Sequence, residues 1–200
     1  RDMDDKPAER AVAREADRRW GWYKLSAFSK PTIAMVNGYC FGGAFIPLCA
    51  CDIAIAADEA TFGLSEVNWG ILPGGLVSKV VTMTMNYRKS MYYAMTGRPF
   101  DGKTAAEIGL VTYSVPGDRL RAEVIELAQD LMKKNAEVLR STKETIKTVR
   151  MMSIEESYEF IQAKTEQLRF RDLENTRGRG MGEFLDEKSY RPGFEAVRRE

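Results

Sequence analysis

The sequence contains no histidine among its 200 residues. This absence excludes a Ser–His–Asp triad, a cysteine–histidine pair and the metal sites that depend on imidazole ligands. Histidine is also the side chain that ordinarily exchanges protons near neutral pH. Any proton transfer by this chain must therefore fall to a carboxylate, a tyrosine, a lysine or water.

Cysteine is scarce, and the chain has only Cys40, Cys49 and Cys51, all within one apolar stretch. An odd and clustered set of this kind does not resemble a disulfide framework. We therefore expect buried, reduced thiols and a cytoplasmic protein.

The sequence also lacks long apolar runs and an excess of either charge. No run approaches the ~18 residues of a membrane span, because the best candidate, 33–57, is interrupted by Asn37, Pro47 and Asp52. Thirty basic residues stand against 29 acidic ones, which leaves a net charge of +1. We therefore expect neither nucleic acid nor a membrane as a partner.

What the chain does contain is a series of short apolar strands among helices, followed by helices alone. Strands are expected at 32–36, 39–41, 52–57, 61–63 and 110–115. Helices are expected at 6–29, 43–51, 76–85, 88–96, 103–108, 118–134, 135–150, 153–171 and 174–187. This order predicts an α/β core over residues 1–117 and a helical region over 118–200.

Two consecutive glycines, Gly42 and Gly43, lie between a predicted strand and a predicted helix. Glycine lets the backbone approach a ligand closely, and a helix that begins there directs its free N–H groups at that ligand. Such a turn suits a developing oxyanion. The alternative is an ordinary tight turn.

Glu66 is a lone carboxylate among the apolar and aromatic residues of 61–70. A carboxylate in such surroundings can act as a general acid or base. The alternative is a glutamate in the first turn of a helix that makes a capping or dipole contact. Asp52 is expected to have a structural role, hydrogen-bonded to backbone where a helix ends or a strand begins.

The ordered segments 31–38, 42–44, 51–56, 62–66, 70–74, 95–97, 105–111 and 115–116 carry a larger pattern. Over about residues 25–195 the chain resembles the crotonase (enoyl-CoA hydratase/isomerase) superfamily. The resemblance implies a crotonase (ClpP-like) α/β fold, a spiral of ββα units with a C-terminal helical region for trimerisation. It also implies an acyl-CoA substrate and self-association as a trimer or a dimer of trimers.

Segments 34–43, 56–70 and 184–189 are similar to those of the hydroxycinnamoyl-CoA (feruloyl-CoA) hydratase-lyase subfamily. This implies a lyase that forms an aromatic aldehyde and acetyl-CoA without a metal or redox cofactor, since coenzyme A is part of the substrate. The alternatives are another crotonase-type hydratase, isomerase or thioester hydrolase, a non-catalytic paralogue that acts as an assembly scaffold, or a binding module independent of coenzyme A.

The resemblance also implies roles for individual residues. Gly43 would donate one oxyanion N–H, and Glu66 would activate water and handle the proton at the α-carbon. Trp69 would line the aromatic acyl pocket, while Phe184 and Lys188 would meet the nucleotide of coenzyme A. Substrate contacts are expected at Gly42, Ile46, Trp69, Gly74 and Gln162.

Two positions depart from the family pattern. Ile46 stands where family members have a second glutamate or, in the lyases, a serine, and Gln162 stands where the lyases place a tyrosine. The sequence also begins at Arg1 rather than methionine. We expect the family's first strands, with the second oxyanion donor and much of the coenzyme A cleft, to precede it.

Overall fold

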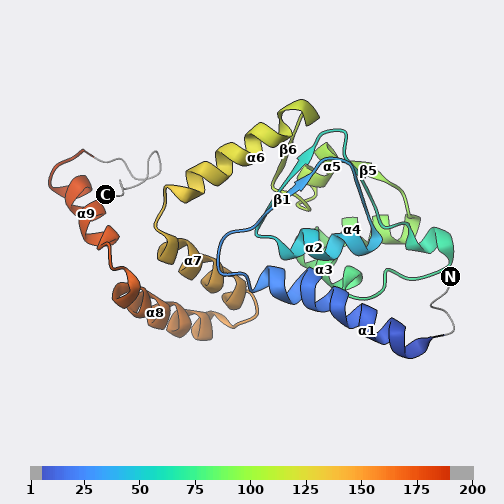
Figure 1. Ribbon diagram of the computed structural model, residues 1–200, viewed down its shortest axis with the longest axis horizontal. Coiled ribbons are helices and arrows are strands. Elements are labelled where there is room, and N and C mark those ends of the chain that lie inside the picture. The colour runs from blue at the N-terminus through green and yellow to red at the C-terminus, as the bar shows by residue number, and fades with distance from the viewer. Residues whose placement is uncertain (1–5, 190–200) are drawn as a thin grey trace. The chain divides into compact units, whose positions relative to one another are not determined.

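The computed structural model describes residues 6–189. Within that range the chain forms two compact units, and Figure 1 shows their elements. The core unit consists of the described residues up to Phe28 together with Thr32–Ile125. The helical unit consists of Ser29–Pro31 together with the described residues from Glu126 onward. The division falls within helix α6 (Gly117–Met132).

The strands of the core unit form two three-stranded sheets. The first is parallel and contains, in order, β1 (Ile33–Val36), β3 (Ile53–Ala57) and β6 (Tyr113–Val115). The second contains, in order, β2 (Tyr39–Phe41), β4 (Thr61–Gly63) and β5 (Phe100–Asp101). Strands β2 and β4 are parallel, whereas β5 is antiparallel to β4. The uninterrupted apolar runs of β1 and β3 are typical of parallel strands covered on both faces.

Helical segments separate and cover these strands. They are α1 (Pro7–Arg18), the π-helical η1 (Arg19–Lys24), the 3₁₀-helical η2 (Gly42–Ala44), α2 (Phe45–Ala50), the 3₁₀-helical η3 (Ser65–Trp69), α3 (Val77–Thr84), α4 (Tyr87–Thr96) and α5 (Gly102–Glu107). The orders β1-β2-α2 and β3-β4-η3 therefore repeat one strand-strand-helix arrangement. The first strands of both repeats pair in one sheet, and the second strands pair in the other.

A row of aromatic rings runs through the core unit. The ring centroids of Phe45 and Phe62 are 6.5 Å apart, those of Phe62 and Phe100 are 5.6 Å apart, and those of Phe100 and Tyr93 are 4.2 Å apart. All four residues are buried. Because aromatic pairs at these separations bury large apolar surfaces, the row joins α2, β4, β5 and α4 into one packed core.

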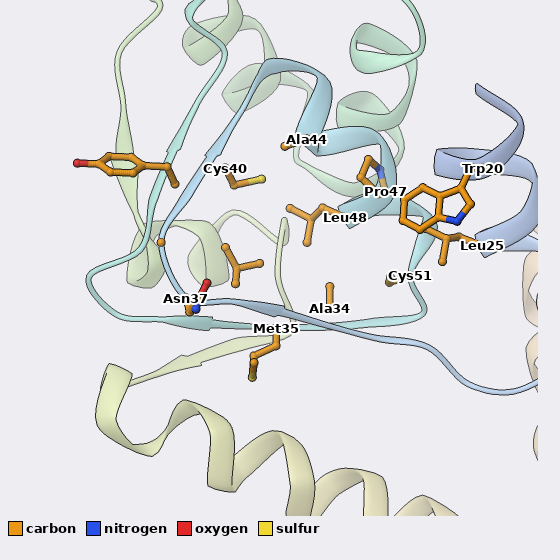
Figure 2. A pocket seen from close by; sticks show the side chains of 13 residues that line it. Trp20, Leu25, Ala34, Met35, Asn37, Cys40, Ala44, Pro47, Leu48 and Cys51 are labelled. Atoms are coloured by element: carbon orange, nitrogen blue, oxygen red, sulfur yellow. The ribbon is translucent and has the colours of Figure 1, made fainter. Parts of the chain in front are cut away.

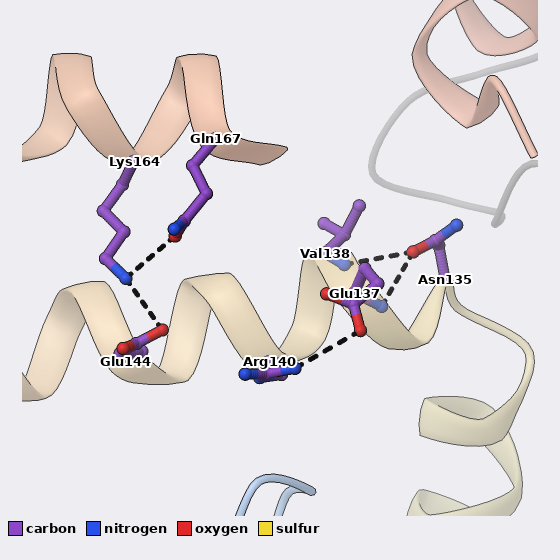
Figure 3. A network of polar contacts seen from close by, with 7 residues as sticks. All are labelled: Asn135, Glu137, Val138, Arg140, Glu144, Lys164 and Gln167. Carbon is purple, nitrogen blue, oxygen red and sulfur yellow. Dashed lines mark hydrogen bonds and ion pairs between the residues drawn. The ribbon is translucent and has the colours of Figure 1, made fainter. Parts of the chain in front are cut away.

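The helical unit contains α7 (Ala136–Val149), α8 (Ile154–Arg171) and α9 (Thr176–Leu185). Helix α7 begins at Asn135, whose side-chain oxygen accepts hydrogen bonds from the N–H groups of Glu137 and Val138 (Figure 3). Such an N-cap satisfies donors that the helix itself leaves unpaired. Lys164 of α8 reaches Glu144 of α7 at 2.9 Å, which ties the two helices together (Figure 3).

The structure corrects two details of the predicted elements. The predicted strand 110–115 begins only at Tyr113, because the N–H groups of Leu110 and Val111 donate to the carbonyl of Ala105 and so close helix α5. The predicted helix 6–29 changes from α1 to the π-helical η1 at Arg19. Asp52 has the expected structural role, since its Oδ2 accepts hydrogen bonds from the N–H and hydroxyl of Thr32.

No helix among residues 6–189 is long and apolar enough to cross a membrane.

Candidate active site

The candidate site lies where the parallel strands β2 and β4 both end. Phe41 and Gly63, the last residues of these strands, are register partners. Since parallel strands end at the same edge of a sheet, the residues that follow them meet there. Gly42 follows Phe41, and η3, which carries Glu66, begins two residues after Gly63. The topology therefore brings together two candidate residues that are 24 positions apart in the sequence.

The carboxylate of Glu66 lies directly against the backbone of Gly42. A Cβ atom built on Gly42 would lie 3.0 Å from Oε1 of Glu66 and 3.5 Å from its Cδ. Gly42 also has a φ angle of +50°, which glycine adopts without the steric penalty of other residues. Both the backbone conformation and the space for the carboxylate thus depend on glycine at position 42.

The Glu66 carboxylate has an oxygen without a protein partner. Oε2 is buried and accepts no hydrogen bond from any residue of the described chain. Glu66 lies in the first turn of η3, as the alternative of a dipole contact expects, but the N-cap residue of η3, Leu64, makes no side-chain capping bond. Buried polar atoms are nearly always hydrogen-bonded, and exceptions gather at sites with a function. Oε2 of Glu66 therefore has the capacity to accept a further hydrogen bond.

Gly43 lies in the first turn of the continuous helical segment formed by η2 and α2. N–H groups in the first turn of a helix have no acceptor within that helix, and the positive end of the helix dipole is at the same place. Gly43 is exposed, and a Cβ atom built on it would meet nothing within 4 Å. Its backbone is therefore open to a ligand that develops negative charge.

Phe41 at the end of β2 packs closely against Gly63 at the end of β4. A Cβ atom on Gly63 would lie 2.3 Å from Cε1 of the Phe41 ring, so the ring occupies the space that any other residue would need. The pair lies immediately before Gly42 on one strand and three residues before Glu66 on the other. Local sequence does not reveal this pair, because only the strand register brings Phe41 and Gly63 together.

Ile46 lies one turn after Gly42 in the same helical segment. Its Cγ2 is 3.8 Å from where a Cβ of Gly21 would be, and its Cδ1 is 3.9 Å from that of Gly75. The side chain is half-buried and has no polar atom. Ile46 can neither hold water nor move a proton. Glu66 therefore has no second glutamate to assist it from position 46. Gly74, next to Gly75, is exposed.

Apolar side chains flank Glu66 along the chain. Trp69, in the same short helix, is 78% exposed, and Ile71 and Leu72 are 61% and 73% exposed. Val67, directly after Glu66, is 42% exposed as well. The structure therefore places Trp69 in one helix with Glu66, while its contact with an acyl group stays a prediction.

The other predicted contacts belong to the helical unit. Gln162 is exposed on α8, Phe184 is 47% exposed on α9, and Lys188 lies just beyond α9. Glu66 and Gly43 belong to the core unit instead. Their roles stay predictions.

A pocket of about 370 Å³ lies beside β1 and α2 (Figure 2). Ala44, which follows Gly43, lines it, whereas Gly43 and Glu66 do not. Cys40 and Cys51 also line it; Cys40 is buried, as predicted, whereas Cys49 and Cys51 are half-buried. Burial raises the pKa of the Cys40 thiol to about 12, so this thiol is a poor nucleophile. The lining of the pocket therefore includes a neighbour of Gly43 but neither of the two candidate catalytic residues.

Comparisons with known proteins identify the family of the chain. Residues 2–193 match the model of the enoyl-CoA hydratase/isomerase family. The chain therefore belongs to the enoyl-CoA hydratase/isomerase family, the crotonase family indicated by its motifs.

The chain is 53% identical over 188 residues to a hydroxycinnamoyl-CoA hydratase-lyase of Pseudomonas fluorescens, a match that covers 94% of this chain and 68% of the relative. It is 39% identical over 125 residues to a probable enoyl-CoA hydratase of Mycobacterium bovis, covering 62% of this chain and 49% of the relative. A crystal structure of an enoyl-CoA hydratase subunit I from Geobacillus kaustophilus superimposes with a TM-score of 0.83 and 26% identity, covering 100% of this chain and 73% of that one. The chain thus spans between about half and about three quarters of these relatives.

Proposed function

We propose that this protein is a hydroxycinnamoyl-CoA hydratase-lyase that converts a substrate such as feruloyl-CoA to an aromatic aldehyde and acetyl-CoA. The observation that carries the chemistry is the position of the Glu66 carboxylate against Gly42, the residue before the exposed Gly43. The buried Oε2 of Glu66 has no hydrogen-bond partner among residues 6–189. The substrate class is supported by 53% identity to the Pseudomonas fluorescens relative of that name.

The first step is the addition of water across the α,β double bond of the thioester. The N–H of Gly43 stabilises the negative charge that develops on the thioester oxygen. Glu66 accepts a proton from water as the water oxygen bonds to the β-carbon, and a proton is delivered to the α-carbon. The product is a β-hydroxy thioester, and Glu66 alternates between base and acid.

The second step breaks the bond between the α- and β-carbons. Glu66 removes the proton of the β-hydroxyl, the aldehyde C=O forms, and the bonding electrons pass to the α-carbon. The resulting acetyl-CoA enolate is stabilised by the same N–H group and is then protonated at the α-carbon. Each step moves one proton through one carboxylate, which suits a site with Ile46 in place of a second glutamate.

The remaining contacts of the substrate follow from the family resemblance. Trp69, Ile46 and Gly74 would line the acyl side, and Gln162 would meet the ring substituent through an amide, which can donate and accept hydrogen bonds. Phe184 and Lys188 would contact the nucleotide of coenzyme A. We propose no metal or redox cofactor, because every bond change above is a proton transfer or a carbon–carbon or carbon–oxygen step.

We further propose that the two strand-strand-helix repeats are turns of the crotonase spiral, and that the protein assembles as a trimer or a dimer of trimers. Support comes from α8, where Ile154, Tyr158 and Ile161 recur at helical spacing with 84%, 63% and 42% of their surfaces exposed. Apolar side chains at this spacing form one stripe. Light scattering of the purified protein tests the assembly.

A cytoplasmic location remains a prediction.

The proposed function is tested by incubating the protein separately with feruloyl-CoA and crotonyl-CoA and analysing the products by liquid chromatography and mass spectrometry. Vanillin and acetyl-CoA in equal amounts are expected from feruloyl-CoA. Hydration of crotonyl-CoA without cleavage of feruloyl-CoA would instead indicate an ordinary enoyl-CoA hydratase. No turnover of either would contradict the proposal and favour a non-catalytic paralogue.

A further inference from the structure

A hydrogen bond links the helix that carries Glu66 to the end of another helix. Asn68 lies two residues after Glu66 in η3, and its Nδ2 donates to the carbonyl of Gly97 at 3.2 Å. Gly97 ends α4 in the left-handed conformation, with a φ angle of +61°. The two partners are 29 residues apart in the sequence.

The side chain of Asn68 also fits closely onto Gly97. A Cβ atom built on Gly97 would lie 2.6 Å from both Nδ2 and Oδ1 of Asn68, so the amide group covers the face of Gly97 where a side chain would stand. The glycine is buried under this contact. Hydrogen bonding and close packing together fix the position of Asn68 relative to the end of α4.

The C-terminal end of α4 is held in place by the packed core of the unit. Tyr93, one turn before Gly97, is buried and contacts Phe100, and the aromatic row continues through Phe62 to Phe45 at the start of α2. Helix α2 belongs to the same helical segment as Gly42. Asn68 therefore attaches η3 to the same packed core that positions Gly42.

Within η3 the remaining hydrogen bonds are local. The N–H groups of Gly70 and Ile71 donate to the carbonyls of Val67 and Glu66, which closes the segment without attaching it to another element. Among the residues that the structure describes, no other side chain of η3 makes a hydrogen bond to a different element. A 3₁₀ segment of this length has weak hydrogen-bond geometry of its own, so its position depends on outside contacts.

We propose that Asn68 is a positioning residue that holds the carboxylate of Glu66 against Gly42, an inference that rests on the proposed function of Glu66. Asn68 does not touch the reacting atoms. It acts by fixing the short helix from which Glu66 projects, and small displacements of a catalytic group lower the rate strongly.

The test compares Asn68→Ala with Asn86→Ala as a matched control. Asn86 caps the other end of α4 by accepting a hydrogen bond from the N–H of Arg88, so its loss weakens the same helix without touching η3. For Asn68→Ala we expect kcat per folded protein to fall about tenfold while KM changes less than about twofold. For Asn86→Ala we expect a lower Tm with kcat and KM unchanged.

A second background separates positioning from general destabilisation. In a Glu66→Asp protein the carboxylate is already displaced, so Asn68→Ala should lower the residual rate less than about twofold further. Equal losses in both backgrounds, or an unchanged kcat for Asn68→Ala, would overturn the proposal.

A readout without substrate keeps the two proposals distinguishable. Amide hydrogen exchange at Gly70 and Ile71 should become faster in Asn68→Ala and stay unchanged in Asn86→Ala, whatever the enzyme's substrate. If the wild-type protein turns over neither feruloyl-CoA nor crotonyl-CoA, the proposed function fails, but the exchange rates still test whether Asn68 holds η3 in place. Unchanged exchange in Asn68→Ala would contradict that role of Asn68.

Discussion

Oxygen Oε1 of Glu66 lies only 3.0 Å from the position that a Cβ atom at residue 42 would take, so the Glu66 carboxylate lies where a side chain in place of Gly42 would need space. The carboxylate and the start of the η2-α2 helix are therefore parts of one site, built at the shared end of β2 and β4. The proposed function requires that a substrate held by the Gly43 N–H lie within reach of Glu66, since acid–base chemistry at the carbon next to a thioester needs that geometry.

Substituting Gly42 by alanine should impair both the backbone and the carboxylate. Alanine at a φ angle of +50° costs about 1–2 kcal/mol, and its Cβ would push Oε1 of Glu66 away from a 3.0 Å contact. We expect at least an ~100-fold loss of kcat, together with a lower free energy of unfolding measured in urea.

The control is Gly43→Ala, whose Cβ would meet nothing within 4 Å. Its free energy of unfolding should be equal to or above that of the wild type, since alanine favours helices more than glycine does. Equal stability losses in Gly42→Ala and Gly43→Ala would contradict the distinct role of position 42.

The Phe41 ring and Gly63 should show energetic coupling. Gly63→Ala places a Cβ 2.3 Å from the ring and should destabilise the protein by about 1–3 kcal/mol. In a protein that already carries Phe41→Leu, the same change should cost less, because leucine lacks the ring atoms in conflict. A double-mutant cycle measured by urea unfolding checks this. Strictly additive effects would show that the ring and Gly63 are independent.

Stability should fall at alkaline pH because of the buried thiols. Burial raises the pKa of Cys40 from 9.0 to about 12, and burial, opposed by a hydrogen bond to Thr84, raises that of Cys49 to about 11. A raised pKa means that the folded protein retains protons which the unfolded chain releases, so the contribution is complete below pH 9 and is lost as pH rises towards these values.

Urea unfolding at several pH values between 7.5 and 10.5 measures this effect. The decline can reach about 1.4 kcal/mol per pH unit for each thiol. Burial also raises the pKa of Tyr93, so the comparison is with Cys40→Ala, in which the decline should be shallower. Parallel curves for the two proteins would exclude Cys40 as a cause.

Much of the site was predictable from local sequence, for physical reasons that particular residues illustrate. Gly42 and Gly43 stand between a strand and a helix, and Glu66 is a single charge in an apolar segment. Both features are local in the chain and belong to the motifs that also indicate the family. The apolar strands β1 and β3 were predictable for the same reason.

The contacts that fix the site were not predictable from local patterns. Asn68 meets Gly97 across 29 residues, and Phe41 meets Gly63 only through the register of two parallel strands. Strand 110–115 was predicted too long because the apolar residues Leu110 and Val111 can serve equally in a strand or in the turn that closes α5. Each case depends on tertiary context, which overrides local propensity.

The central claim is that the carboxylate of Glu66 carries out proton transfer on a hydroxycinnamoyl-CoA thioester. The most direct test measures wild type and Glu66→Gln side by side, with vanillin formation from feruloyl-CoA as the activity and titration calorimetry with a non-reactive analogue as the binding assay. We predict that Glu66→Gln loses at least about 100-fold in kcat and binds the analogue with unchanged affinity. Wild-type turnover by Glu66→Gln would contradict the account.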